Sequence, residues 1–179
     1  ALGSGAIVLR HPVNLGQGAA LNTGMRFAVA SGADFILTFD ADGQHRVEDI
    51  HRLINAQRET GADLVMGSRF LGSTEGAPAS RELFMRLAAW FTWMTTGVRL
   101  SDAHNGLRPL TRDAAAKIEL RENRFAHASE ILAEIRAARL RFVERPTAIV
   151  YTERSVAKGQ PMWNSVKIVF DLLLRRIFR

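Results

Sequence analysis

Two aspartates that follow an apolar segment are the residues best placed to do chemistry. Residues 35–39 are rich in β-branched and aromatic types, which predicts a buried strand, and Asp40 and Asp42 come directly after it. Alternate residues of an extended segment point the same way, so both carboxylates can converge on one cation. Oxygen ligands suit Mg²⁺ or Mn²⁺, and such an ion would carry a diphosphate.

The same residues also fit a simple turn, in which Asp42 and Gly43 supply loop chemistry after the strand. Gln44 and His45 add polar groups at the same edge. The Asp-x-Asp pattern alone does not decide between the two interpretations. Its position favours a binding site, because open α/β sheets bind ligands at the carboxyl ends of their strands.

A strand, a glycine-rich loop and a helix are predicted near the start of the chain. Residues 6–9 form a short apolar run, and apolar residues recur at helical spacing over residues 19–29. Between them Asn14, Gly16 and Gly18 resemble a phosphate cradle at a helix N-terminus. The dinucleotide-binding fingerprint fits poorly, because its third glycine would fall at Leu21. The glycines fit a tight turn equally well.

The rest of the chain alternates predicted strands and helices, which predicts a mostly parallel sheet. Strands are predicted at 62–66 and as a pair over 141–150, interrupted by Pro146. Residues 67–73 and 101–113 read as loops, with a short helix ending at 118 and longer helices over 47–59, 81–98, 125–138 and 163–179. Arg69 then lies just beyond a strand, on the same side as the aspartates.

The predicted helix over 81–98 is apolar nearly all round and holds Trp90, Phe91 and Trp93. Such a helix is either buried, which is the commoner case and our expectation, or lies against an apolar surface such as a membrane boundary. The amphipathic segment 161–179 ends in basic residues and is expected to dock on the domain, on a partner or on an anionic bilayer.

Composition bounds the class of protein. A chain of 179 residues with 47% hydrophobic content predicts one domain over 1–179, and the absence of cysteine excludes disulfides and fits a reducing cytoplasm. We find no signal peptide and no membrane-spanning run, and a chain that opens without Met is expected to be a piece of a longer protein. The net charge of +6 is scattered, which is typical of a solvated surface, so nucleic acid is not an expected partner.

Six segments, in this order, carry a resemblance across almost the whole chain: NLGQGAALNTG, FDADGQH, GSRF, NGLRPL, SEIL and RPTAIVYTERSVAKGQ. They resemble the inverting family 2 glycosyltransferases, and within them the polyprenyl-phosphate group that includes dolichyl-phosphate mannosyl- and glucosyltransferases. The resemblance implies the glycosyltransferase A fold, a doubly wound α/β sandwich, here lacking its first strand and helix. It also implies a nucleotide-sugar donor and a divalent metal.

The resemblance further implies roles for residues that match the family's motifs. Asp40 and Asp42 match the metal motif, and Gln44 stands where the polyprenyl-phosphate members use a further metal-side ligand. Arg69 and Arg81 resemble residues that receive acceptor or donor phosphate.

Later motifs imply further roles. Asp102 and the segment that contains Arg108 match an acidic loop beside the sugar, and Glu130 stands where many relatives carry a catalytic acid. Lys158 resembles a mobile lid residue that closes on the donor. Two local departures are Gln17, where a lysine is common, and the pair Ser129 and Glu130, where many relatives end this motif in aspartate.

The chemistry also bears on the acceptor. Displacement at an anomeric carbon builds negative charge on the leaving diphosphate, which a metal ion and arginines stabilise. A hydroxyl acceptor needs a general base, for which Asp102 and Glu130 are candidates, whereas a lipid phosphate is already ionised and needs cations. Arg69, Arg81 and the aromatic helix favour the phosphate. Asp102 is then the expected essential acid, and Glu130 is expected to be structural.

We therefore expect a metal-dependent, inverting hexosyltransferase that moves a sugar from UDP or GDP to a polyprenyl phosphate, at the cytoplasmic face of the membrane. The open alternatives are transfer to a hydroxyl and a nucleotide-binding scaffold without catalysis. A nucleic-acid module would rest on charge alone, and a Rossmann oxidoreductase fits least. The sequence leaves the oligomeric state open.

Overall fold

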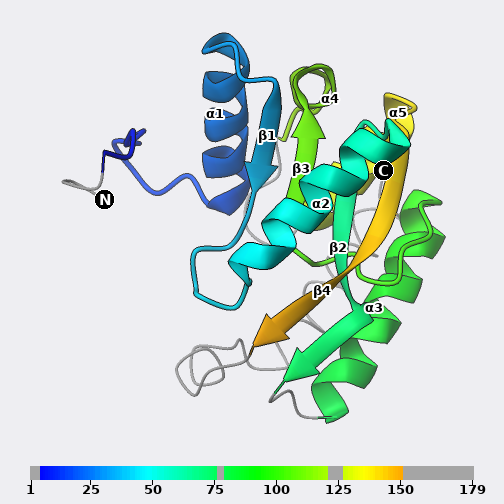
Figure 1. The fold of residues 1–179 in the computed structure, drawn as a ribbon. Helices are drawn as coiled ribbons and strands as arrows, with labels where there is room; N and C mark the ends of the chain where they lie inside the picture. Colours follow the sequence, from blue (N-terminus) through cyan, green and yellow to red (C-terminus); the bar gives the residue numbers. More distant parts are fainter. Residues whose placement is uncertain (1–4, 76–78, 121–126, 151–179) are drawn as a thin grey trace.

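The computed structural model describes residues 5–75, 79–120 and 127–150. A four-stranded sheet in the order β1-β3-β2-β4 forms its centre (Figure 1). The strands are β1 (Phe35–Thr38), β2 (Leu64–Glu75), β3 (Arg108–Thr111) and β4 (Phe142–Val150). β2 pairs parallel with β4, while β3 pairs antiparallel with both β1 and β2. β1, β2 and β4 therefore run in one direction, which confirms the mostly parallel α/β sheet.

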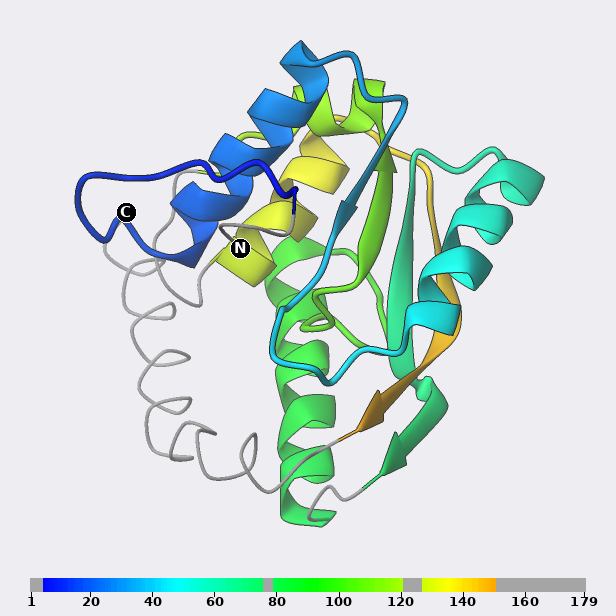
Figure 2. The same cartoon turned by 60° about the vertical axis from the view of Figure 1, so that its left-hand side comes forward.

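Helices cover both faces of this sheet, as Figure 2 shows. They are α1 (Gln17–Ala30), α2 (Val47–Thr60), α3 (Ala79–Thr96), α4 (Arg112–Lys117) and α5 (His127–Ala137). The larger core packs α1, α3, α4 and α5 against one face, around Leu64, Met66 and Leu132. On the other face Leu53 of α2 packs against Val65. Successive residues of β2 thus serve opposite cores, as the two-residue period of a strand requires.

The structure corrects the predicted strands in three places. Residues 6–9 form no strand, and Ile7, Val8 and Leu9 are exposed. β2 continues through Glu75, so the predicted loop 67–73 is strand, and β4 passes through Pro146 instead of forming a pair. Pro146 aligns with Ser68 next to an irregularity in the β2–β4 register, a position that tolerates a residue without an N–H group.

β3 is a strand inside a segment that was predicted to be a loop. It lies between β1 and β2 although Pro109, opposite Leu37, cannot donate a backbone hydrogen bond there. Leu110 of β3 pairs with Leu64 of β2, and backbone hydrogen bonds from Gly67 to Leu107 at 3.1 Å and from Thr111 to Asp63 at 2.9 Å flank that pair. Because β3 begins opposite the last residue of β1, the loop at 101–107 lies next to the end of β1.

The helix predictions at 47–59 and 81–98 are confirmed, but α3 is not buried as expected. Four of its apolar side chains are more than half exposed. Among the described residues, no helix is both long enough and apolar enough to cross a bilayer. The predicted segment 161–179 lies outside the described residues.

Candidate functional site

The site is built where β1 ends and β3 begins. Thr38 aligns with Arg108, and the Thr38 hydroxyl donates a 3.0 Å hydrogen bond to the carbonyl oxygen of Gly106. The loop before β3 is thereby fixed against the segment that carries Asp40. Two predicted motifs, far apart in the sequence, thus meet at one edge of the sheet.

Asp40 lies at the centre of this meeting point. Its side chain is 39% exposed, and its Oδ1 accepts a 3.1 Å hydrogen bond from the Gln17 side-chain amide at the start of α1. The Nε2 atom of His45 lies 3.9 Å from Asp40 Oδ2. Asp40 therefore connects the glycine loop, the Asp-x-Asp segment and the loop before β3.

Asp42 does not lie on an extended segment, so strand alternation does not make its carboxylate point the same way as that of Asp40. β1 ends at Thr38, the chain turns at residues 41–42, and Gly43 has a φ of 79°. The Asp42 carboxylate accepts a 3.1 Å hydrogen bond from the backbone N–H of Gln44, which is the side-chain bond of an Asx turn. The predicted turn is thus confirmed, with Asp42 exposed beside it.

Arg69 and Asp102 form a buried ion pair. Asp102 Oδ2 accepts hydrogen bonds from Arg69 Nε at 2.6 Å and from the Arg69 backbone N–H at 3.1 Å. Their side chains are 9% and 1% exposed. The other Asp102 oxygen accepts a 3.3 Å bond from the backbone N–H of His104. Since Arg69 belongs to β2 and not to a loop, a strand holds this cation in place.

Glu144, a residue that the sequence analysis missed, holds the Asp102 loop. Its carboxylate accepts hydrogen bonds from the Ser101 backbone N–H at 2.9 Å and hydroxyl at 2.8 Å. It also accepts a 3.2 Å bond from the Asp102 N–H, and the hydroxyls of Ser101 and Ser68 lie 2.6 Å apart. Glu144 lies within a strand and belongs to no recognisable motif, so its sequence context does not indicate this role. The pairing of β4 with β2 brings it to the Asp102 loop.

Arg108 is a buried cation whose charge interacts with the carboxylates of Asp102 and Asp40. It is 4% exposed, its Nη2 donates to the carbonyl oxygen of Ala103 at 3.2 Å, and its buried Nε has no hydrogen-bond partner among the described residues. Burial lowers the pKa of Arg108 to about 10, and the negative charges of Asp102 and Asp40 oppose that shift. Arg69, Asp102, Arg108 and Asp40 thus form a group of alternating charges.

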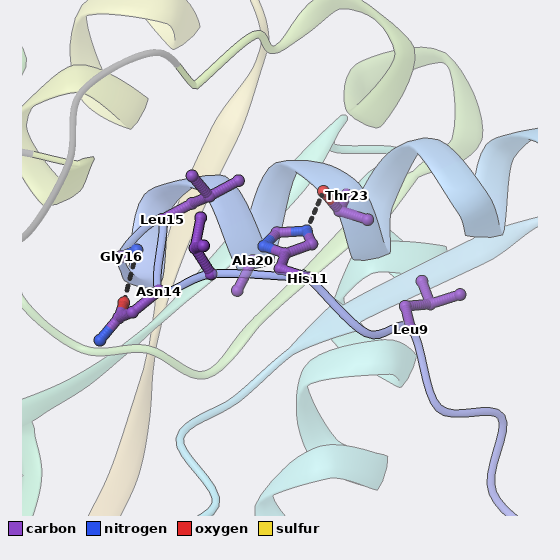
Figure 3. Close-up of a pocket in the computed structure, with 8 residues that line it drawn as sticks. Leu9, His11, Asn14, Leu15, Gly16, Ala20 and Thr23 are labelled. Carbon is purple, nitrogen blue, oxygen red and sulfur yellow. Dashed lines mark hydrogen bonds between the residues drawn. The ribbon is translucent and has the colours of Figure 1, made fainter.

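The glycine loop begins α1 beside a shallow hollow, shown in Figure 3. Gly16 caps the helix with a φ of 89°, and its N–H donates a 2.9 Å bond to the Asn14 side chain. His11 and Thr23 are joined across the hollow at 3.0 Å. Gly18 is buried in the first turn. The loop therefore has the tight turn that its glycines predict.

The structure describes less about the remaining predicted residues. Arg81 falls in the first turn of α3, but its side chain lies outside the described part. Glu130 is half-buried in the first turn of α5, whose Ile131, Leu132 and Ile135 pack in the core. Lys158 lies outside the described residues.

Within residues 5–75, 79–120 and 127–150, no three His, Cys, Asp or Glu side chains are grouped so that they could hold a metal ion. A magnesium site does not require such a group, because Mg²⁺ keeps several waters and is bound through one or two carboxylates together with substrate phosphates. Asp40 and Asp42, both accessible to solvent, fit a site of this open kind.

Comparisons with known proteins agree with this arrangement. Residues 1–139 match the family described as Glycosyl transferase family 2. An uncharacterized protein of Methanocaldococcus jannaschii is 33% identical over 97% of this chain and 73% of its own length. The UDP-N-acetylglucosamine–dolichyl-phosphate N-acetylglucosaminyltransferase of Methanococcus voltae is 31% identical over 96% of this chain and 70% of its own.

The undecaprenyl-phosphate mannosyltransferase of Micrococcus luteus is also similar, at 31% identity over 86% of this chain and 63% of its own length. The match to the family covers the glycine loop, the Asp-x-Asp segment, Arg69 and the Asp102 loop together. The chain therefore belongs to glycosyltransferase family 2 and is a glycosyltransferase.

Proposed function

We propose that this glycosyltransferase moves a hexose, with inversion, from a UDP- or GDP-sugar to a polyprenyl phosphate. The observation that carries the proposal is the group of alternating charges, in which the buried Arg108 interacts both with the accessible Asp40 carboxylate and with Asp102, the carboxylate that binds Arg69. Relatives named for transfer to dolichyl phosphate and undecaprenyl phosphate support this class of acceptor.

Asp40 and Asp42, with Gln44 nearby, would hold a divalent ion together with the donor diphosphate. Such an ion, when bound, neutralises negative charge that develops on the leaving diphosphate. Asp40 already has a fixed position, because Gln17 donates to its Oδ1. The hydrogen bond from the Gln44 N–H holds the Asp42 side chain in the turn that follows Asp40. The chain thus supplies two oxygen ligands and leaves other positions for water and phosphate.

The state of Asp102 supports a phosphate acceptor over a hydroxyl. A general base must be able to accept a proton, yet both Asp102 oxygens accept hydrogen bonds and one pairs with Arg69. Protonation of Asp102 would leave a buried arginine without its counter-ion, which is costly. A phosphate acceptor needs no such base, and Asp102 would act by holding Arg69 in place.

One face of α3 supports a location at a membrane surface. Leu83, Leu87, Trp90 and Met94 recur at intervals of three and four residues and are 55–61% exposed. Arg86 stacks on Phe70, and Arg99 stacks on Trp93 near the same face. Apolar and aromatic side chains bordered by arginines fit the boundary of an anionic bilayer. The other side of α3 reaches the site, because Met85 Sδ contacts Arg69 Nη1 at 3.4 Å.

The test is formation of lipid-linked sugar by the full-length protein. UDP- and GDP-sugars are supplied with a polyprenyl phosphate or with the matching polyprenol, and with Mg²⁺, Mn²⁺ or a chelator. We expect product only with the phosphate and a metal, and a loss of about 100-fold or more in Asp42→Ala, since metal stabilisation is worth several kcal/mol. Glu59→Ala, at an exposed position of α2, is the control. Equal rates for Asp42→Ala and the control would contradict the metal role.

A further inference from the structure

The Asp40 carboxylate rests against a glycine of the loop before β3. A side chain built on Gly106 would place its Cβ 2.8 Å from Asp40 Cγ and 3.0 Å from Asp40 Oδ1. These separations are too short for real contacts, so the carboxylate occupies the space that any other residue at 106 would fill. Gly106 has no positive φ, so an added side chain at this position would meet the Asp40 carboxylate and would not strain the backbone.

Gly106 is itself fixed in place. The Thr38 hydroxyl bonds to its carbonyl oxygen at 3.0 Å, and the preceding Asn105 is 1% exposed. Asn105 donates to the Thr147 hydroxyl at 3.0 Å and accepts from the Leu107 N–H at 3.0 Å. The surface under Asp40 therefore belongs to a rigid loop that is anchored to β1 and β4.

Arg108 supplies the charge next to this surface. Its guanidinium is buried, donates to the carbonyl oxygen of Ala103, and has an Nε that finds no hydrogen-bond partner in the described part of the chain. Its charge interacts with the carboxylates of both Asp102 and Asp40, so Arg108 contributes to the electrostatic attraction on Asp40. A buried cation acts strongly over a few ångströms because little water screens it.

We propose that Gly106 and Arg108 are positioning residues that hold the Asp40 carboxylate in its metal-binding orientation. Gly106 gives the carboxylate a place to lie, Arg108 attracts it there, and Gln17 holds it from the side of α1. This inference rests on the proposed function, because it assumes that Asp40 binds a divalent ion. It assigns to Arg108 a role different from the place beside the sugar that the resemblance implies for its segment.

The test measures Mn²⁺ binding to the full-length protein, by the fall in the spin-resonance signal of free Mn²⁺. We expect Gly106→Ala to weaken Mn²⁺ binding about 10- to 100-fold, as loss of groups that orient metal ligands does. The Asp40 side chain can move aside, so the melting temperature should change little. Gly24→Ala is the matched control, because Gly24 lies within α1 with no atom within 4 Å of an added Cβ. Arg108→Met tests the charge separately.

Two further variants separate the possible failures. If wild-type protein does not bind Mn²⁺, or if Asp40→Asn binds it equally well, both the proposed metal site and this inference are overturned. If Asp40→Asn weakens binding while Gly106→Ala and Arg108→Met do not, only the positioning role is overturned. In the double variant Asp40→Asn/Gly106→Ala, we expect no loss beyond that of Asp40→Asn alone, since Gly106 acts through Asp40. If the losses from the two substitutions were additive, Gly106 would not act through Asp40.

Discussion

Asp102 binds Arg69 twice, once at the guanidinium and once at the backbone N–H, and both side chains are buried. A carboxylate that binds a cation in this way sets the position of the positive charge. In the proposed reaction, this pair would orient the charge that an acceptor phosphate meets.

Asp102→Ala should destabilise the protein by about 3–5 kcal/mol, because it removes the carboxylate that binds the buried Arg69 guanidinium and backbone N–H. Urea unfolding measures the change. Asp34→Ala is the control, since it breaks the exposed pair with Arg112 and should cost less than about 1 kcal/mol. The double variant Arg69→Met/Asp102→Ala should recover part of the loss. Equal losses for Asp102→Ala and Asp34→Ala would contradict the buried pair.

Glu144→Ala should lower the free energy of unfolding by about 1–3 kcal/mol, because the donors of Ser101 and Asp102 lose their shared acceptor. The transfer rate should fall as well, since the loop that holds Asp102 loosens. Unfolding and lipid-linked sugar formation are measured on the same preparations. An unchanged rate in a variant that is measurably less stable would show that Glu144 supports only the fold.

The sequence predicted best those parts in which residue pattern and tertiary environment agree. α2 is an example, because Ile50 and Leu53 recur at helical spacing and pack on the sheet as that spacing requires. β3 could not be predicted, because Pro109 is unfavourable in an inner strand and only the strands on either side make it one. Local pattern carries no information about such neighbours.

The same limit explains what the sequence analysis missed in the site. Asp40 and Asp102 were found because their motifs are compact, whereas Glu144 and Gly106 act only through contacts with residues far away in the chain. The assumption that Asp40 and Asp42 lie on one extended segment was wrong, because the Asx turn at Asp42 bends the chain. Side-chain direction after a strand depends on where the strand ends.

Arg108 should affect stability in a pH-dependent manner that is confined to alkaline solution. Its pKa is lowered to about 10 from an ordinary value of 12.5, so between these values the unfolded state binds the proton and the folded state does not. Stability from this group therefore rises as pH increases through that range. We expect the unfolding free energy of wild type minus that of Arg108→Met to be constant from about pH 7 to 9. Above about pH 10 this difference should increase in favour of wild type. A change in that difference below pH 9 would contradict the assignment.

The exposed face of α3 gives the last prediction. Leu87→Ser and Trp90→Ser together should weaken binding of the full-length protein to vesicles that contain anionic lipid, because each removes apolar surface that would enter the bilayer boundary. Phe27→Ser, on the exposed side of α1, is the matched control and should leave binding unchanged. Cosedimentation with vesicles measures binding, and thermal unfolding checks that all variants remain folded.

Transfer to a short, water-soluble polyprenyl phosphate separates docking from chemistry. The α3 double variant should retain its rate with this acceptor, because neither side chain belongs to the group of charges around Asp40, but lose rate with a long acceptor in vesicles. Loss with both acceptors would mean that α3 supports the site itself. Unchanged vesicle binding would mean that another surface meets the membrane.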